Sequence, residues 1–162
     1  MTYVLHSLPA SISLEIAERI VDGALAAARR IGTAPMAVAV LDAGGHLVAF
    51  KRQDGVAFLR CDIAQGKAWT ALAMGTSSRG SRDRLAERPT FQAALSSLSQ
   101  GRFIPVPGGV LLLDANQRVI GAAGMSGDAS DKDEGCCIEA IHAVGLRSYP
   151  AAPAAGWETA VG

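Results

Sequence analysis

The sequence predicts an α+β fold in which helices flank an antiparallel sheet. Two observations lead to this prediction: short apolar segments of strand length come in pairs joined by tight turns, and segments with helical spacing lie between the pairs. A turn of a few residues can join only antiparallel neighbours, whereas a parallel pair needs a long crossover. The order helix, hairpin, helices, hairpin, helix therefore favours one antiparallel sheet over a doubly wound parallel one.

The first helix and the first hairpin have clear sequence signals. Apolar side chains recur every three or four positions over residues 13–31, and Ser13 can cap the first turn of this helix. A continuous apolar segment at 36–41 is typical of a strand that is covered on both faces. The turn at 42–45 leads to a second strand at 46–51, which completes the hairpin.

Helical segments are expected between the two hairpins, at 59–74, 82–88 and 90–98, with a Ser- and Gly-rich stretch before the second of them. The second hairpin follows, with strands at 110–114 and 118–125. Its strands are flanked by Gly-rich loops, and a helix start follows, so backbone N–H groups can meet a small ligand there.

The last helix begins with an acidic first turn. Ser130 can cap this helix, and Asp133, three positions later, takes the place of the reciprocal partner in a capping box. Asp131 and Glu134 lie in the same turn, where the helix dipole favours negative charge. We expect Gly145 to end the helix.

Length and composition indicate one domain. A chain of 162 residues with 49% hydrophobic content can bury a proper core. We assign this domain to residues 1–147 and a small-residue tail to 148–162. Lys plus Arg and Asp plus Glu each number 15, which gives no reason to expect nucleic acid or an anionic membrane as a partner. No apolar run can span a bilayer and the N-terminus lacks a signal-peptide pattern, so we expect a cytoplasmic protein.

Small residues around the second hairpin form one candidate binding region. Gly108 and Gly109 can present backbone donors to a carboxylate or another anion, or they can simply let a strand enter the sheet without a clash. Ser126 and Gly127 can form an anion-binding nest. The acids at 128–134 would repel an anion placed nearby, which favours a capping role for them.

Two cations can complete this region. Arg52 lies where a strand ends, and Lys67 lies inside an Ala-rich helix, where a charge that faces the sheet needs a partner. If both side chains point into one pocket, they suit a ligand carboxylate. The alternative is an exposed arginine and a lysine whose stem covers apolar surface.

Several separated segments match one known family in order. They are AVAVLDAGGHLVA at 37–49, KRQDGV at 51–56, GKAWTA at 66–71, IPVPGGV at 104–110 and GAAGMSGDASDKDE at 121–134. Through them the chain resembles the GlcG/HbpS family, a haem-binding-like domain that is also the C-terminal part of PduO-type cobalamin adenosyltransferases. The resemblance implies a profilin-like fold, haem or another tetrapyrrole as one candidate ligand, and a homo-oligomer, from dimer to octamer.

The sequence departs from the family pattern near the expected pocket. Gln53 stands where the family usually has Met, and Leu111 stands where it usually has Pro. Haem binders of the family tend to use a histidine in the region of the first helix, and residues 13–31 contain none. The candidate axial ligands that remain are His6, His46 and His142.

Two functions follow from these residues, and a purely structural role as an assembly domain is the third alternative. The first is an oligomeric protein that binds a small ligand, with haem as a candidate cofactor. The alternative is a cofactor-free enzyme, such as an isomerase, tautomerase or hydrolytic dehalogenase, which acts on a small carboxylate in organic-acid or aromatic catabolism. In that enzyme Arg52 and Lys67 would hold the carboxylate, and Asp133 or Glu134 would move the proton. The three cysteines lack zinc spacing, so no metal site is expected apart from haem iron.

Overall fold

The computed structural model describes residues 12–162, so His6 lies outside the described part of the chain. The strands are β1 (Ala37–Asp42), β2 (Leu47–Arg52), β3 (Gly109–Leu113), β4 (Val119–Ser126) and β5 (Arg147–Tyr149). The helices are α1 (Leu14–Ile31), α2 (Leu59–Met74), α3 (Ser78–Leu85), α4 (Pro89–Leu98), α5 (Ser130–Ala143) and the short 3-10 helix η1 (Trp157–Thr159). The strands form one sheet in the order β2-β1-β4-β3-β5.

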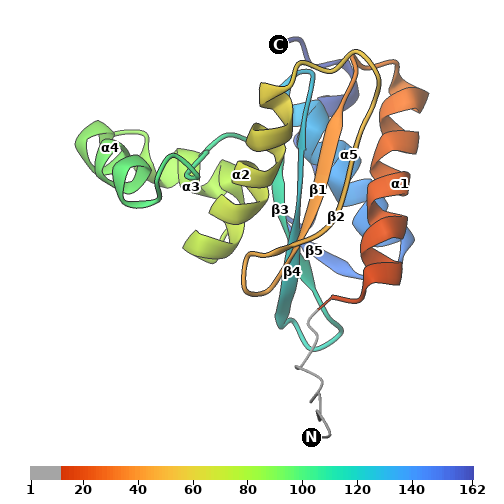
Figure 1. The fold of residues 1–162 in the computed structure, drawn as a ribbon, viewed down its shortest axis with the longest axis horizontal. Coiled ribbons are helices and arrows are strands. Elements are labelled where there is room, and N and C mark those ends of the chain that lie inside the picture. The colour runs from red at the N-terminus through yellow and green to blue at the C-terminus, as the bar shows by residue number, and fades with distance from the viewer. Residues whose placement is uncertain (1–11) are drawn as a thin grey trace, which may run out of the picture.

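The sheet confirms the predicted α+β class. β1 with β2 and β3 with β4 are the two expected hairpins, and the antiparallel pairing of β1 with β4 places them side by side. β5, which the sequence does not predict, pairs with β3 at one edge. Helices cover both faces of this antiparallel sheet (Figure 1), which confirms the profilin-like arrangement that the resemblance implies.

α1 and α5 cover one face of the sheet and share the larger core with it (Figure 1). Ile20 of α1 and Ile141 of α5 belong to this core together with strand residues such as Val38. The predicted cap of α1 is confirmed, because Ser13 Oγ accepts a hydrogen bond from the backbone N–H of Ile16 at 3.3 Å. The spacing of apolar residues therefore identified both the helix and the face that it buries.

The predicted cap of α5 is wrong. The helix begins at Ser130 itself, and Ala129 stands at the capping position without a side-chain hydrogen bond. The Asp128 carboxylate accepts the N–H of Ala129 at 2.6 Å instead. The Asp133 carboxylate accepts the N–H of Asp128 through one oxygen and meets Lys67 with the other, and neither contact is with Ser130. A long-range ion pair has replaced the local capping box.

The boundary of α3 also differs from the prediction of a helix at 82–88. The Ser-rich stretch that resembles a linker is a helix start, because Ser77 Oγ accepts the N–H of Gly80 at 3.0 Å and caps a helix that begins at Ser78. This earlier start brings the side chains that follow Ser77 onto the body of the domain.

α2 lies on the other face of the sheet. Its backbone comes so close to the strands that a side chain on the strand residues beneath it would not fit. Gly109 of β3 and Gly124 of β4 are cross-strand partners beneath this helix. A Cβ atom on Gly109 would overlap the carbonyl oxygen of Lys67, and one on Gly124 would overlap the carbonyl oxygen of Ala64. Glycine is therefore required at both positions by close approach of the helix backbone, and this approach fixes where Lys67 leaves α2.

Two segments extend the central layers. α3 and α4 project sideways from the sheet (Figure 1), and we call residues 78–98 the arm. The segment expected to be a tail at 148–162 contributes part of β5 and then crosses α5, where the Trp157 ring packs on Gly135. Much of this segment is thus attached to the fold.

Candidate functional site

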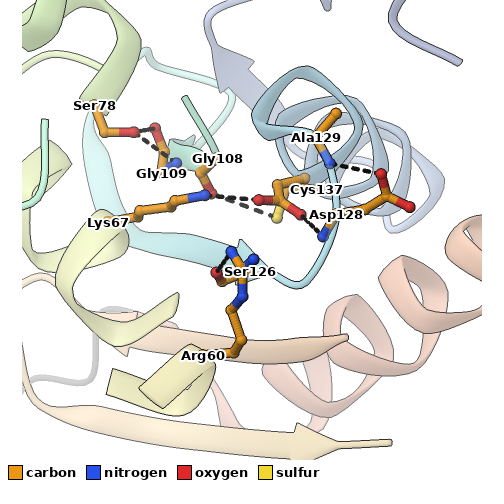
Figure 2. A network of polar contacts seen from close by, with 10 residues as sticks. Arg60, Lys67, Ser78, Gly108, Gly109, Ser126, Asp128, Ala129 and Cys137 are labelled. Carbon is orange, nitrogen blue, oxygen red and sulfur yellow. Dashed lines mark hydrogen bonds and ion pairs between the residues drawn. The ribbon is translucent and has the colours of Figure 1, made fainter. Parts of the chain in front are cut away.

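Residues from distant parts of the chain meet at one end of the sheet (Figure 2). Lys67 comes from α2, Gly109 begins β3, and Gly108 lies directly before it. Asp133 and Glu134 come from α5. Because α2 and α5 lie on opposite faces of the sheet, their side chains can meet only past the strand ends. The structure therefore brings together most of the residues that the sequence singled out.

Lys67 and Asp133 form a buried ion pair. Lys67 Nζ lies 2.7 Å from Asp133 Oδ2, and the two side chains are 2% and 0% exposed. The backbone N–H of Asp128 donates to the other carboxylate oxygen of Asp133 at 3.4 Å. Burial raises the pKa of Asp133 to about 6, although the Lys67 ammonium opposes this rise. The pair is therefore charged at neutral pH and loses its negative partner in mild acid.

Glu134 and Arg79 form a second pair, which is less complete. Arg79 Nε lies 3.1 Å from Glu134 Oε2, with 24% and 0% exposure of the two side chains. This is an ion-pair distance without hydrogen-bond alignment, because neither Glu134 oxygen has a hydrogen-bond partner among the described residues. Burial raises the pKa of Glu134 to about 7, and Arg79 only partly offsets this effect. We call Lys67, Asp133, Arg79 and Glu134 the charge cluster.

Glu134→Gln is expected to remove a pH dependence of stability. The pKa of Glu134 rises from 4.5 to about 7 on folding, so the folded protein holds this proton where the unfolded chain releases it. Stability should fall as pH rises from about 4.5 to about 7 and stay constant above, and this contribution is worth roughly 3 kcal/mol. Urea unfolding of both proteins from pH 4 to pH 8 measures it, since the difference between the curves isolates Glu134. Parallel curves would show that Glu134 titrates normally.

The glycine loop of the site is occupied by contacts within the chain. The N–H of Gly109 donates to Ser78 Oγ at 2.7 Å, and the carbonyl of Gly108 accepts the N–H of Met125 at 3.1 Å. Cys137 Sγ lies 3.9 Å from the same carbonyl (Figure 2). The Gly109 donor that the sequence offers to a ligand is thus hydrogen-bonded inside the protein.

The other predicted cation lies apart from the charge cluster. Arg52 is exposed at the end of β2, and Ala37 of β1 separates it from Ser126 in the sheet register. Arg60, and not Arg52, is the arginine that contacts Ser126, because its Nη1 donates to Ser126 Oγ at 3.3 Å (Figure 2). Gly127 follows Ser126, and a Cβ atom on Gly127 would overlap the carbonyl oxygen of Pro35.

Sequence reasoning missed Arg60, Arg79 and Ser78. Ser78 and Arg79 lie in the Ser- and Gly-rich stretch that was expected to separate two helices, and the usable signal was Ser77 as a helix cap three residues before Gly80. Arg60 lies in the first turn of α2, and nothing in its local sequence distinguishes it from a surface arginine.

Two cavities of about 360 Å³ lie away from the charge cluster. One lies beside α2, and its lining includes Trp69 and Arg102, whose guanidinium stacks 4.5 Å from the ring centroid. The other lies between α5 and the C-terminal segment, and its lining includes His142 and Trp157. Neither cavity is lined by a member of the charge cluster, so a ligand in these cavities would meet other groups.

Hydrogen bonds set the tautomer of His142. The Ser148 hydroxyl donates its single proton to the carbonyl of Pro150 at 2.7 Å, so it can only accept from His142 Nε2, which lies 2.9 Å away. In the neutral ring the proton is therefore on Nε2, and Nδ1 carries the free lone pair. Histidines that bind metals have this arrangement, in which the second ring nitrogen donates to a fixed acceptor.

His142 is the histidine of residues 12–162 that lines one of these two cavities. Its cavity has apolar walls from Ile138 and Trp157. His142 is itself exposed, and what distinguishes it from His46 is this cavity. His46 is 80% exposed on a turn, with Nδ1 3.2 Å from Asp42 Oδ1. Within residues 12–162 no three His, Cys, Asp or Glu side chains are grouped to hold a metal ion by themselves.

The fold and this site define a small profilin-like α+β domain, and comparison with known proteins gives its family. The family model for haem degrading protein HbpS-like matches residues 12–142. The chain belongs to the HbpS-like family.

Individual relatives agree with this family. An uncharacterised 15.0 kDa protein from the dhaT-dhaS intergenic region of Citrobacter freundii is 31% identical over 124 residues, which cover 76% of this chain and 85% of that protein. Corrinoid adenosyltransferase PduO of Citrobacter freundii is 26% identical over 115 residues, which cover 71% of this chain but only 34% of PduO. The crystal structure of the PduOC:heme complex has a TM-score of 0.76 and 25% identity, and the match covers 85% of this chain and 98% of that one.

Proposed function

We propose that this chain is a self-associating protein that binds a small ligand, and that haem is this ligand. Membership of the HbpS-like family and the similarity to a domain crystallised with haem support the proposal. The observation that carries it is His142, which borders a cavity of about 360 Å³ with its Nδ1 lone pair free. A bound haem would supply a redox-active iron.

The residues around His142 would each have one task in binding. His142 Nδ1 would hold the iron, and the hydrogen bond from Nε2 to Ser148 would fix the ring plane. The Trp157 ring would cover an apolar edge of the ligand. Arg30 pairs with both carboxylates at the rim, Glu139 at 2.6 Å and Glu158 at 3.0 Å, and so reduces their repulsion of haem propionates.

A haemin titration followed at the Soret band tests this proposal. The wild-type protein should give a saturable shift at one haem per chain, and His142→Ala should weaken binding by about tenfold or more because the residue that would hold the iron is lost. His46→Ala is the matched control and should bind as the wild type does. His6→Ala probes the candidate outside the described residues.

Two outcomes would contradict the proposal in different ways. The absence of a saturable shift in the wild-type protein would exclude haem as the ligand. If His142→Ala binds haem as the wild type does and His6→Ala loses binding, the residue that holds the iron would be His6 and not His142.

The cofactor-free enzyme receives no support from the charge cluster. Asp133 and Glu134, the predicted proton-transfer groups, have no exposed surface and face cations of the same chain. Their catalytic role and the carboxylate substrate stay predictions. No helix within residues 12–162 is long and apolar enough to cross a membrane, and a cytoplasmic location also stays a prediction.

A further inference from the structure

α4 is a helix that one copy of the chain leaves largely uncovered. None of the residues Pro89–Leu98 is buried by the described part of the chain, and Leu98 and Phe91 are 82% and 40% exposed. An isolated helix shorter than about 12–15 residues is marginal in water, and helices in proteins gain most of their stability by packing an apolar face. α4 therefore needs a packing surface that residues 12–162 of one copy do not supply.

An apolar groove of about 270 Å³ lies along the base of α4. Its apolar lining comes from α2, from the C-terminal half of α4 and from the loop that follows: Trp69, Ala73, Met74, Leu95, Leu98 and Phe103. A cavity of about 150 Å³ with such a lining can hold a benzene ring. The groove therefore has room for one large apolar side chain from another molecule.

The apolar side chains of α4 form a stripe that fits this groove in a second copy. Phe91, Leu95 and Leu98 recur at helical spacing and so lie on one face of the helix. If two α4 helices pack antiparallel about a two-fold axis, the Phe91 end of one lies beside the Leu98 end of the other. The groove is at the Leu98 end, so each copy would insert Phe91 into the groove of its partner.

The charges of the arm also favour a second copy as the partner. Residues 89–98 contain no charged side chain, so packing α4 on itself buries no charge. The preceding segment has both signs, with Asp83 and Glu87 between arginines such as Arg88. Such an apolar centre with a charged rim is the usual anatomy of an interface, and both signs on one rim can pair across a two-fold axis.

We propose that the arm is the self-association surface of this protein, in which α4 of each copy packs into the groove between α2 and α4 of the other. Arginines already lie over two aromatic rings here, Arg88 over Phe91 at 4.6 Å and Arg102 over Trp69 at 4.5 Å. Arg and aromatic side chains are enriched in the centres of interfaces. The inference rests on the self-association proposed above and names its surface.

The experiment compares the mass in solution of the wild type, Leu98→Asp and Leu14→Asp by light scattering after gel filtration. Leu14 is the control because it is 56% exposed in the first turn of α1, on the opposite side of the sheet from the arm. The wild type and Leu14→Asp should have the same mass, a multiple of the 16.7 kDa chain. Leu98→Asp should shift to a lower-order state with dissociation at about 100-fold higher concentration.

The variant should still fold, because Leu98 is 82% exposed in one copy, and a far-UV circular dichroism melt checks this. An unchanged mass for Leu98→Asp would overturn the arm as the interface while leaving self-association standing. An equal fall in mass for Leu98→Asp and Leu14→Asp would show that the loss of association is not specific to the arm, and this would also overturn the proposal. A wild-type protein that runs as a single chain at every concentration would overturn self-association as well. None of these outcomes changes the haemin titration, so the ligand proposal fails or stands separately.

Discussion

Lys67→Met is expected to lower the free energy of unfolding by about 3–5 kcal/mol at pH 8, because it leaves the Asp133 carboxylate buried without its cation. Urea unfolding followed by circular dichroism measures the loss. The loss should be smaller at pH 5, below the Asp133 pKa of about 6, because the carboxyl group can then take up a proton and become neutral.

A surface ion pair of the same length provides the control for this prediction. Lys51 Nζ lies 2.7 Å from Asp22 Oδ1, but the two side chains are 51% and 60% exposed. Lys51→Met should therefore cost less than about 1 kcal/mol. The double variant Lys67→Met with Asp133→Asn should recover part of the loss, because no unpaired charge then stays buried. Equal losses at Lys67 and Lys51 would refute the idea that burial determines the cost.

Gly124→Ala is expected to destabilise the protein by about 3 kcal/mol or more, because the new Cβ atom would overlap the Ala64 carbonyl and lie 2.8 Å from Ala68 N. α2 would have to move away from the sheet, which also displaces Lys67. Thermal and urea unfolding measure the effect. A matched control is Gly75→Ala at the end of α2, where φ is +64° but no atom lies within 4 Å of a Cβ atom. Backbone strain alone should cost about 1 kcal/mol there.

The two glycine variants separate steric overlap from backbone strain. If Gly124→Ala were no more harmful than Gly75→Ala, the contact between α2 and the sheet would be looser than the structure indicates. A large loss at Gly124 alone would show that the close approach of the helix is a requirement of this fold.

Local sequence was sufficient for the elements whose signals are local. The alternation of apolar segments and turns identified both hairpins, and Ser13 correctly marked the start of α1. The capping box at Ser130 failed because Asp133 is bound by a side chain 66 positions away. A capping pattern describes what a carboxylate can do nearby, and it contains no information on a stronger distant partner.

The candidate site shows the same division. Lys67, Gly109 and Asp133 were singled out because a charge in an Ala-rich helix, a glycine pair and an acidic turn are visible in sequence. Their mutual contacts depend on helices from opposite faces of the sheet, which no local window contains. Arg79 was missed because a Ser-rich helix start resembles a linker.

The ion pair between α2 and α5 makes the two helical layers one cooperative unit. Lys67 belongs to the layer on one face of the sheet and Asp133 to the layer on the other, and the pair closes around the end of the strands. If either helical layer separates from the sheet, the charged side chain of the other layer loses its ion-pair partner. Partial opening of a single face is thereby disfavoured. Because the ion pair joins helices on both faces of the sheet, a proton bound at Asp133 weakens the packing of both.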